Sequence, residues 1–149
     1  MIAVTEERSN WRDEMISKRH RMWGFNCPAV DIDFLAMEYS VAKPVALVEY
    51  KHFNARQPDY QHPSYRAFRD LCDNYKFGPL PFVVVFYWPD CWAFRAVPQN
   101  TAAAEHFDEA ETMCEFDYVA KLYRLRRLVV ARELEGRLSH ALPGASEAA

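Results

Sequence analysis

The chain has 149 residues, about the length of one ordinary domain, and half of them are apolar. This composition suffices for one packed core and excludes an intrinsically disordered chain. The formal net charge of -3 excludes a protein that is basic over its whole surface, so any site for nucleic acid has to be a local patch. The four cysteines form no C-x-x-C pair and no zinc-ligand cluster, which indicates reduced core residues.

No segment has the features of a secretory leader or of a membrane span. The first ten residues lack the apolar stretch of a signal peptide. The longest apolar run, Phe82 to Trp88, has the length of a strand instead. We therefore expect a cytoplasmic protein that makes no contact with a membrane.

The first third of the chain predicts a helix and then two strands. Thr5 to Met22 begins with acidic and ends with basic residues, as the helix dipole favours, and Gly24 follows it. Val30 to Tyr39 indicates a strand, with Asp31 and Asp33 on one face and Ile32 and Phe34 on the other. Only a short connection separates it from a second strand, Val45 to Tyr50, so we expect an antiparallel hairpin.

The middle of the chain predicts a helix and two more strands. Pro63 suits a first helical position, and aromatic residues recur at helical spacing from there to Lys76. The apolar run from Phe82 to Trp88 is typical of a central, buried strand. Trp92 to Val97 then returns as its neighbour.

The last third predicts helices. Ala102 to Phe107 suits a short helix, and Glu115 to Leu138 is the longest helical pattern of the chain. We expect one domain over residues 1–142 and a disordered tail over 143–149. The element order predicts an α/β protein of the mixed α+β type, with a central mixed sheet of about four strands flanked by helices.

Acidic and basic side chains gather in the expected hairpin. Side chains alternate between the faces of a strand, so Glu49 and Lys51 share one face. If the tip of the hairpin is Ser40 to Ala42, Asp33 lies opposite Glu49. If the tip is Val41 to Lys43 instead, Asp33 lies opposite Lys51.

Two carboxylates that face each other across neighbouring strands favour a cation between them. Opposed Cβ atoms are roughly 4.5–5.5 Å apart, and two carboxylates that close repel each other. Mg²⁺ prefers such oxygen ligands and is usually held by one or two carboxylates plus water and phosphate. An ammonium beside the ion, here that of Lys51, can hold a phosphate oxygen or orient a water molecule. The hairpin therefore predicts hydrolysis of a phosphodiester.

Two segments carry a resemblance to a known family. "VDIDFL" at Val30 to Leu35 and "ALVEYKH" at Ala46 to His52 resemble the PD-(D/E)XK nuclease superfamily, in which an acid on one strand precedes Glu/Asp-x-Lys at the end of the next. The resemblance covers roughly Trp11 to Trp88, and the Pro-Asp dipeptide itself is absent. It implies a restriction-endonuclease-like fold and a Mg²⁺- or Mn²⁺-dependent endodeoxyribonuclease of a resolvase-like or phage type. It also implies a homodimer, for which Glu115 to Leu138 could supply the interface.

The resemblance also implies roles for individual residues. Asp33, Glu49 and the backbone carbonyl of Tyr50 would hold the metal, and Lys51 would be the catalytic lysine. Four residues are secondary candidates for the site, with Asp31 competing for the role of Asp33 and Glu14 chosen on position alone: Asp31, Glu14, His52 and Gln61. Three arginines are candidates for contact with the nucleic acid: Arg19, Arg21 and Arg66.

Other readings of the same residues remain open. Glu-x-Lys is common by chance, so Glu49 and Lys51 could be a solvated strand end. The chain could also be a catalytically inactive module of the same fold that binds DNA or protein, or a hydrolase of another phosphate ester. Tyr60 and Tyr65 lie near the expected site and could stack on bases, although most aromatic residues of a small domain belong to its core.

Overall fold

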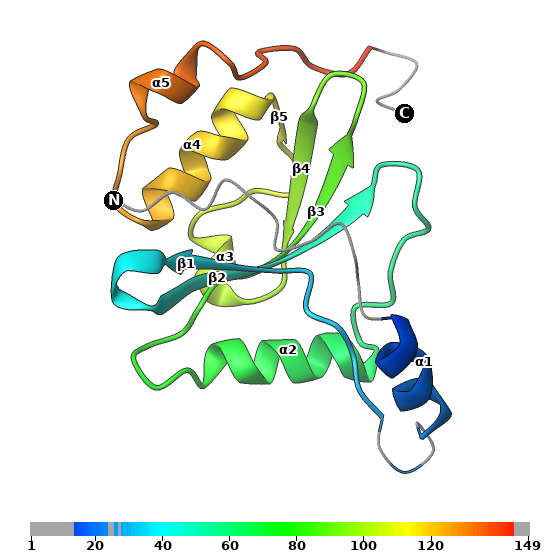
Figure 1. Ribbon diagram of the computed structural model, residues 1–149. Coiled ribbons are helices and arrows are strands. Elements are labelled where there is room, and N and C mark those ends of the chain that lie inside the picture. The colour runs from blue at the N-terminus through cyan, green and yellow to red at the C-terminus, as the bar shows by residue number, and fades with distance from the viewer. Residues whose placement is uncertain (1–13, 24–25, 27, 145–149) are drawn as a thin grey trace.

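The fold is built on a five-stranded mixed sheet (Figure 1). This computed structural model describes residues 14–23, 26 and 28–144. The strands lie in the order β1-β2-β3-β4-β5; all neighbours are antiparallel except β2 and β3, which are parallel. The elements in chain order are α1 (Glu14–Met22), β1 (Phe34–Glu38), a 3-10 turn η1 (Tyr39–Val41), β2 (Lys43–His52), α2 (Pro63–Asp73), β3 (Phe82–Trp88), β4 (Ala93–Pro98), α3 (Thr101–Ala104), β5 (Thr112–Met113), α4 (Glu115–Leu125) and α5 (Arg132–Glu135). The expected α+β class is confirmed, with one strand more than expected.

The central strand β3 has the bounds that its apolar run predicts. Val83, Val84 and Val85 are completely buried, because helices cover both faces of the sheet. Figure 1 shows α2 on one face and α3 and α4 on the other. The crossover through α2 explains why β2 and β3 are parallel.

Helix α2 packs three side chains at helical spacing against the sheet. Tyr65, Phe68 and Cys72 are buried and contact a row of sheet residues: Leu47, Phe82, Val84, Phe86 and Val97. Pro63 occupies the first turn, as expected, and the His62 side chain caps the helix by accepting a hydrogen bond from the Ser64 amide. The helix ends at Asp73, three residues before the expected Lys76.

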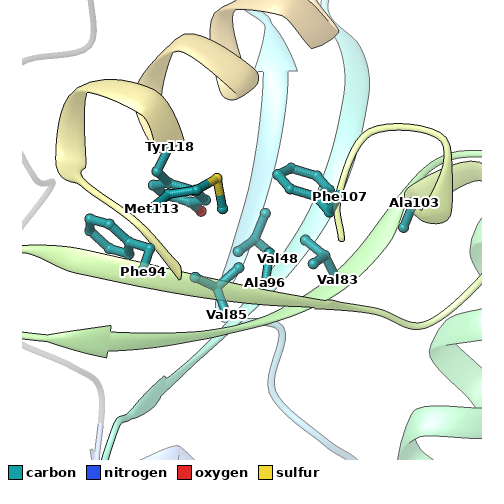
Figure 2. Packing of buried hydrophobic residues seen from close by; sticks show 9 residues of the cluster. All are labelled: Val48, Val83, Val85, Phe94, Ala96, Ala103, Phe107, Met113 and Tyr118. Carbon is teal, nitrogen blue, oxygen red and sulfur yellow. The ribbon is translucent and has the colours of Figure 1, made fainter. Parts of the chain in front are cut away.

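The opposite face of the sheet holds the second core cluster. Figure 2 shows its nine residues, which come from β2, β3, β4, β5, α3, α4 and the segment after α3: Val48, Val83, Val85, Phe94, Ala96, Ala103, Phe107, Met113 and Tyr118. The rings of Phe94 and Tyr118 stack with centroids 4.3 Å apart, which fixes α4 over β4. The buried Met113 belongs to β5, a strand of two residues that is too short to be recognised by alternation.

The single helix expected over Glu115 to Leu138 is a wrong prediction. α4 ends at Leu125, and α5 begins only at Arg132. Arg127 has a left-handed backbone (φ 58°), and the Leu128 amide donates to the Tyr123 carbonyl at 3.0 Å, which is the hydrogen bond of a Schellman stop. The expected dimer surface of one long helix is therefore divided into two short ones.

An ion pair holds this break in place. Arg126, the residue after α4, donates two hydrogen bonds to the Glu38 carboxylate, at 2.5 and 3.2 Å. Glu38 is the last residue of β1, so the pair ties the end of α4 to the hairpin. The Arg126 guanidinium lowers the pKa of Glu38 through this hydrogen bond.

The other bounds differ from expectation by a few residues. The strand expected over Val30 to Tyr39 begins only at Phe34, and its neighbour extends to His52 instead of Tyr50. β4 is shifted by one residue, and α3 ends at Ala104. The expected helix start before Glu14 and the tail after Gly144 lie outside the described residues.

Two further expectations concern the thiols and the membrane. Cys72 and Cys114 are buried and free, as expected, while Cys91 is half-buried and Cys27 lies outside the described residues. In the described part of the chain, no helix combines the length and the apolar character that crossing a bilayer requires.

Candidate functional site

The two expected metal ligands, Asp33 and Glu49, lie at the end of the hairpin that is opposite its turn. Phe34 pairs with Val48 and Leu35 with Leu47, so the next pair in this register is Asp33 with Glu49. The register expected for a tip at Ser40 to Ala42 is thus confirmed for this part of the hairpin, and the alternative that opposes Asp33 to Lys51 is wrong. A bulge after Ala36 shifts the pairing only toward the turn.

Asp33 is bound to the neighbouring strand by its side chain. Its Oδ2 accepts a hydrogen bond from the backbone amide of Tyr50 at 3.2 Å. The carboxylate therefore takes the place of a main-chain acceptor, which explains why β1 starts at Phe34 and not earlier. The same bond holds the Asp33 carboxylate close to the backbone of Glu49 and Tyr50.

Glu49 lies on the face of the sheet that α2 covers. It is half-buried on β2, pairs with Val84 of β3, and follows Leu47 on the same face. Its Oε2 atom is buried and has no hydrogen-bond partner among the described residues. A buried carboxylate oxygen without a partner is costly, so a further group is expected to satisfy it.

Tyr65 of α2 lies beside this carboxylate. Burial raises the pKa of the Tyr65 phenol, and the Glu49 carboxylate raises it further, with a smaller effect from Asp33. Both acids therefore act on one phenol, which agrees with their opposed positions in the hairpin. Tyr65 stays protonated at neutral pH and can only donate to the carboxylate beside it.

A cavity of about 490 Å³ adjoins the two acids. Its lining comes from α1, the segment before β1, β2 and α2, and comprises Ile16, His20, Arg21, Ala29, Val30, Asp31, Asp33, Glu49, Ser64 and Phe68. In Figure 1, α1 lies beside the N-terminal end of α2, which brings this helix to the site. The cavity thus combines three carboxylates with the cationic side chain of Arg21 and the imidazole of His20.

Lys51 lies on β2, two residues after Glu49 and beyond the residues that line the cavity. It shares the face of Glu49, because side chains alternate along a strand, and it pairs with Phe86 of β3. It is half-buried and is not among the residues that line the cavity. Its ammonium makes no hydrogen bond or ion pair within the described residues, so it is available to a ligand.

The secondary candidates and the three arginines expected to contact nucleic acid differ in whether they line the cavity. Arg21 and Asp31 line the cavity, whereas Arg19 lines a separate shallow hollow on α1. His52 lies on the other face of the sheet, against the Tyr87 ring at 5.6 Å. Gln61, just before α2, and Arg66, in its first turns, are exposed and do not line the cavity. The side chain of Glu14 lies outside the described residues.

The donor set available to a metal is small. No group of three or more His, Cys, Asp or Glu side chains in the described residues is arranged to hold an ion. Asp33 and Glu49 supply two carboxylates, and the Tyr50 carbonyl, a predicted third ligand, belongs to the residue directly after Glu49. Such a set suits Mg²⁺ or Mn²⁺, which keep several waters and take further ligands from a phosphate.

Sequence reasoning missed one charged residue near this site. Arg95 of β4 pairs with Phe86, so it lies on the same face as Lys51 and Glu49. The available signal was a lone cation among the apolar residues of the strand Ala93–Pro98.

Comparison of the chain with protein-family models, curated proteins and solved structures finds no match, so its function has to be argued from this geometry.

Proposed function

We propose that the protein is a Mg²⁺- or Mn²⁺-dependent nuclease that hydrolyses phosphodiester bonds in DNA. One observation carries the proposal: the buried Oε2 of Glu49 has no hydrogen-bond partner in the described part of the chain, and Asp33 is opposed to Glu49 across the hairpin. Two carboxylates in this arrangement are more stable with a cation between them than without one. The neighbouring Lys51 is the feature that directs the proposal toward phosphate chemistry.

Each residue has a distinct part in the proposed reaction. Asp33, Glu49 and the Tyr50 carbonyl hold the ion, which when bound acidifies a water molecule and neutralises charge on the phosphate. Lys51 binds a phosphate oxygen or orients the attacking water. Arg21 and His20, which line the same cavity, contact the strand beside the cleaved bond.

The hairpin and the crossover supply rigidity for this task. β2 has hydrogen-bonded neighbours on both sides, and its residues Ala46, Leu47 and Val48 are buried. Glu49 and Lys51 follow directly on this buried segment, so their backbone positions are fixed by the sheet. A site on a central strand holds its ligands more exactly in place than a site on a loop.

The test is cleavage of plasmid and branched DNA with Mg²⁺, with Mn²⁺ and with EDTA. Wild-type protein is expected to cut only with the metal, and Glu49→Gln and Lys51→Ala are each expected to lower the rate about 100-fold or more. Matched substitutions of exposed residues that do not line the cavity, Glu133→Gln on α5 and Lys76→Ala after α2, should leave the rate unchanged. Cleavage that persists in Lys51→Ala or in EDTA would refute the proposal.

The same assay separates the enzyme from a binding module. DNA that binds but is never cut, with an affinity that Lys51→Ala does not alter, would indicate a catalytically inactive member of this fold. Sedimentation of the free protein and of its DNA complex tests the homodimer that the resemblance implies. Two cuts on opposite strands require two such sites, so a monomer in the complex would exclude concerted cleavage of both strands by one particle.

A further inference from the structure

Two cations flank one aromatic ring on the face of the sheet that carries Glu49. Lys51 of β2 pairs with Phe86 of β3, and Phe86 pairs with Arg95 of β4. Paired residues of neighbouring strands present their side chains on the same face. Lys51, Phe86 and Arg95 therefore form one row across three strands, next to Glu49. Because adjacent strands are about 4.8 Å apart, the backbones of the two cations are separated by roughly 10 Å.

The Arg95 guanidinium lies over the Phe86 ring. Its guanidinium carbon lies 4.8 Å from the centroid of the Phe86 ring, which is the geometry of a cation–π contact. The contact fixes the direction of the side chain but does not neutralise its charge. Arg95 forms no ion pair with a carboxylate of the described residues. Together with Lys51 it makes a local positive patch on a protein whose net charge is -3.

The charge of Arg95 reaches the same region as that of Glu49. Burial raises the pKa of the Tyr60 phenol; the Arg95 charge lowers it, and the charges of Glu109 and Glu49 raise it. The pKa of the Tyr60 phenol thus depends on both the Arg95 guanidinium and the Glu49 carboxylate. The Tyr60 ring in turn contacts Tyr65 of α2, with centroids 5.6 Å apart. Arg95 therefore belongs to the surroundings of the proposed catalytic site, although it lies far from the hairpin in sequence.

We propose that Arg95 binds a phosphate of the DNA strand next to the phosphate that is cleaved. The inference rests on the proposed function, because it takes Lys51 and the two carboxylates as the place of cleavage. A planar guanidinium can donate two parallel hydrogen bonds to a phosphate, and an arginine already stacked on a ring loses little freedom on binding. The strand would then run across the sheet from β2 toward β4, over the row Lys51, Phe86 and Arg95.

The experiment measures binding of fluorescently labelled DNA by anisotropy in EDTA, where cleavage is absent, over a series of salt concentrations. Arg95→Gln is expected to weaken binding about tenfold and to reduce the slope of log K against log salt by about one. Arg95→Lys keeps the charge and should keep the slope. Arg132→Gln on α5, a matched control far from the row, should change neither value.

A second measurement locates the contact on the DNA. Replacing single phosphates by neutral methylphosphonates should reveal one position, beside the cleaved bond, where the replacement weakens binding of wild-type protein. At this position the replacement should weaken binding of Arg95→Lys to a smaller degree and leave binding of Arg95→Gln unchanged. This comparison within each variant stays valid if Arg95→Gln is less stable. Equal affinity and slope for Arg95→Gln and wild type, with metal-dependent cleavage intact, would overturn the role of Arg95 and leave the nuclease standing. Wild-type protein that neither binds nor cleaves DNA would overturn both.

Discussion

The phenolic oxygens of Tyr50 and Tyr118 lie 2.6 Å apart, and their hydrogen bond joins β2 to α4. Tyr50 follows Glu49 in the chain, so its side chain points to the opposite face of the sheet from the carboxylate. Burial raises the pKa of both phenols; the hydrogen bond opposes this for Tyr50 and adds to it for Tyr118. The hydrogen bond between these two neutral phenols thus fixes β2 to α4 on the face of the sheet opposite the Glu49 carboxylate.

Removing this bond should weaken the fold and change its response to alkali. Tyr118→Phe is expected to lower the free energy of unfolding by about 0.5–1.5 kcal/mol. In wild type the unfolded tyrosines ionise near pH 10, whereas the folded phenols remain protonated. Stability is therefore complete below about pH 10 and is lost as the pH rises further. The variant should lose less between pH 9 and 11 in urea unfolding, and Tyr75→Phe should behave as wild type; equal alkaline losses in all three would contradict the coupling.

Two substitutions of Asp33 separate its structural role from its proposed role as a ligand. Asp33→Asn retains an oxygen that can accept from the Tyr50 amide, whereas Asp33→Ala removes the acceptor. We expect both variants to lose Mn²⁺ binding in calorimetry, and only Asp33→Ala to lose stability, by about 0.5–1 kcal/mol. If Asp33→Asn binds Mn²⁺ with wild-type affinity, Asp33 is not a ligand.

The phenol of Tyr65 is expected to orient the Glu49 carboxylate. Tyr65→Phe keeps the ring, which packs against Phe82 with centroids 6.2 Å apart, and removes the hydroxyl group beside Glu49. Groups that orient a metal ligand typically contribute 10- to 100-fold to metal affinity. Calorimetry with Mn²⁺ should show a loss of about tenfold, while the urea midpoint changes little. A large drop in the midpoint with unchanged affinity would assign Tyr65 to packing alone.

The two-residue strand β5 should matter more for stability than its length suggests. Met113 is only 2 % exposed and fills the cluster between the sheet and α4. Met113→Ala is expected to cost about 2–5 kcal/mol, because the cavity that it leaves is lined by rigid neighbours. Met37→Ala on the edge strand β1, where the side chain is 37 % exposed, should cost far less. Chemical unfolding of both variants makes the comparison.

Local patterns predicted the central part of the fold and reduced the pairing of Asp33 to two alternatives. The bounds of β3 could be predicted because Phe82 to Trp88 is an unbroken apolar run, as expected of a strand that is buried on both faces. Strand alternation and a short turn left two registers open for the hairpin, and the structure has the one that opposes Asp33 to Glu49.

Nonlocal packing explains what the sequence left hidden. Nothing in the apolar pattern marks Arg127, a non-glycine residue with positive φ that ends α4, so the helix was expected to continue. Arg95 reaches the site only because the crossover through α2 sets β3 between β2 and β4. The position of α1 beside α2, which brings Arg21 and His20 to the cavity, is likewise a matter of tertiary contact.

The location of both proposed ligands on one hairpin has a consequence for the order of folding. Asp33 and the Tyr50 amide that it binds are 17 residues apart, so closing this loop costs little chain entropy. Arg95 must wait for the crossover through α2 and for the pairing of three strands, which are slower, long-range events. We therefore expect a refolding chain to gain its affinity for divalent ions before its affinity for DNA.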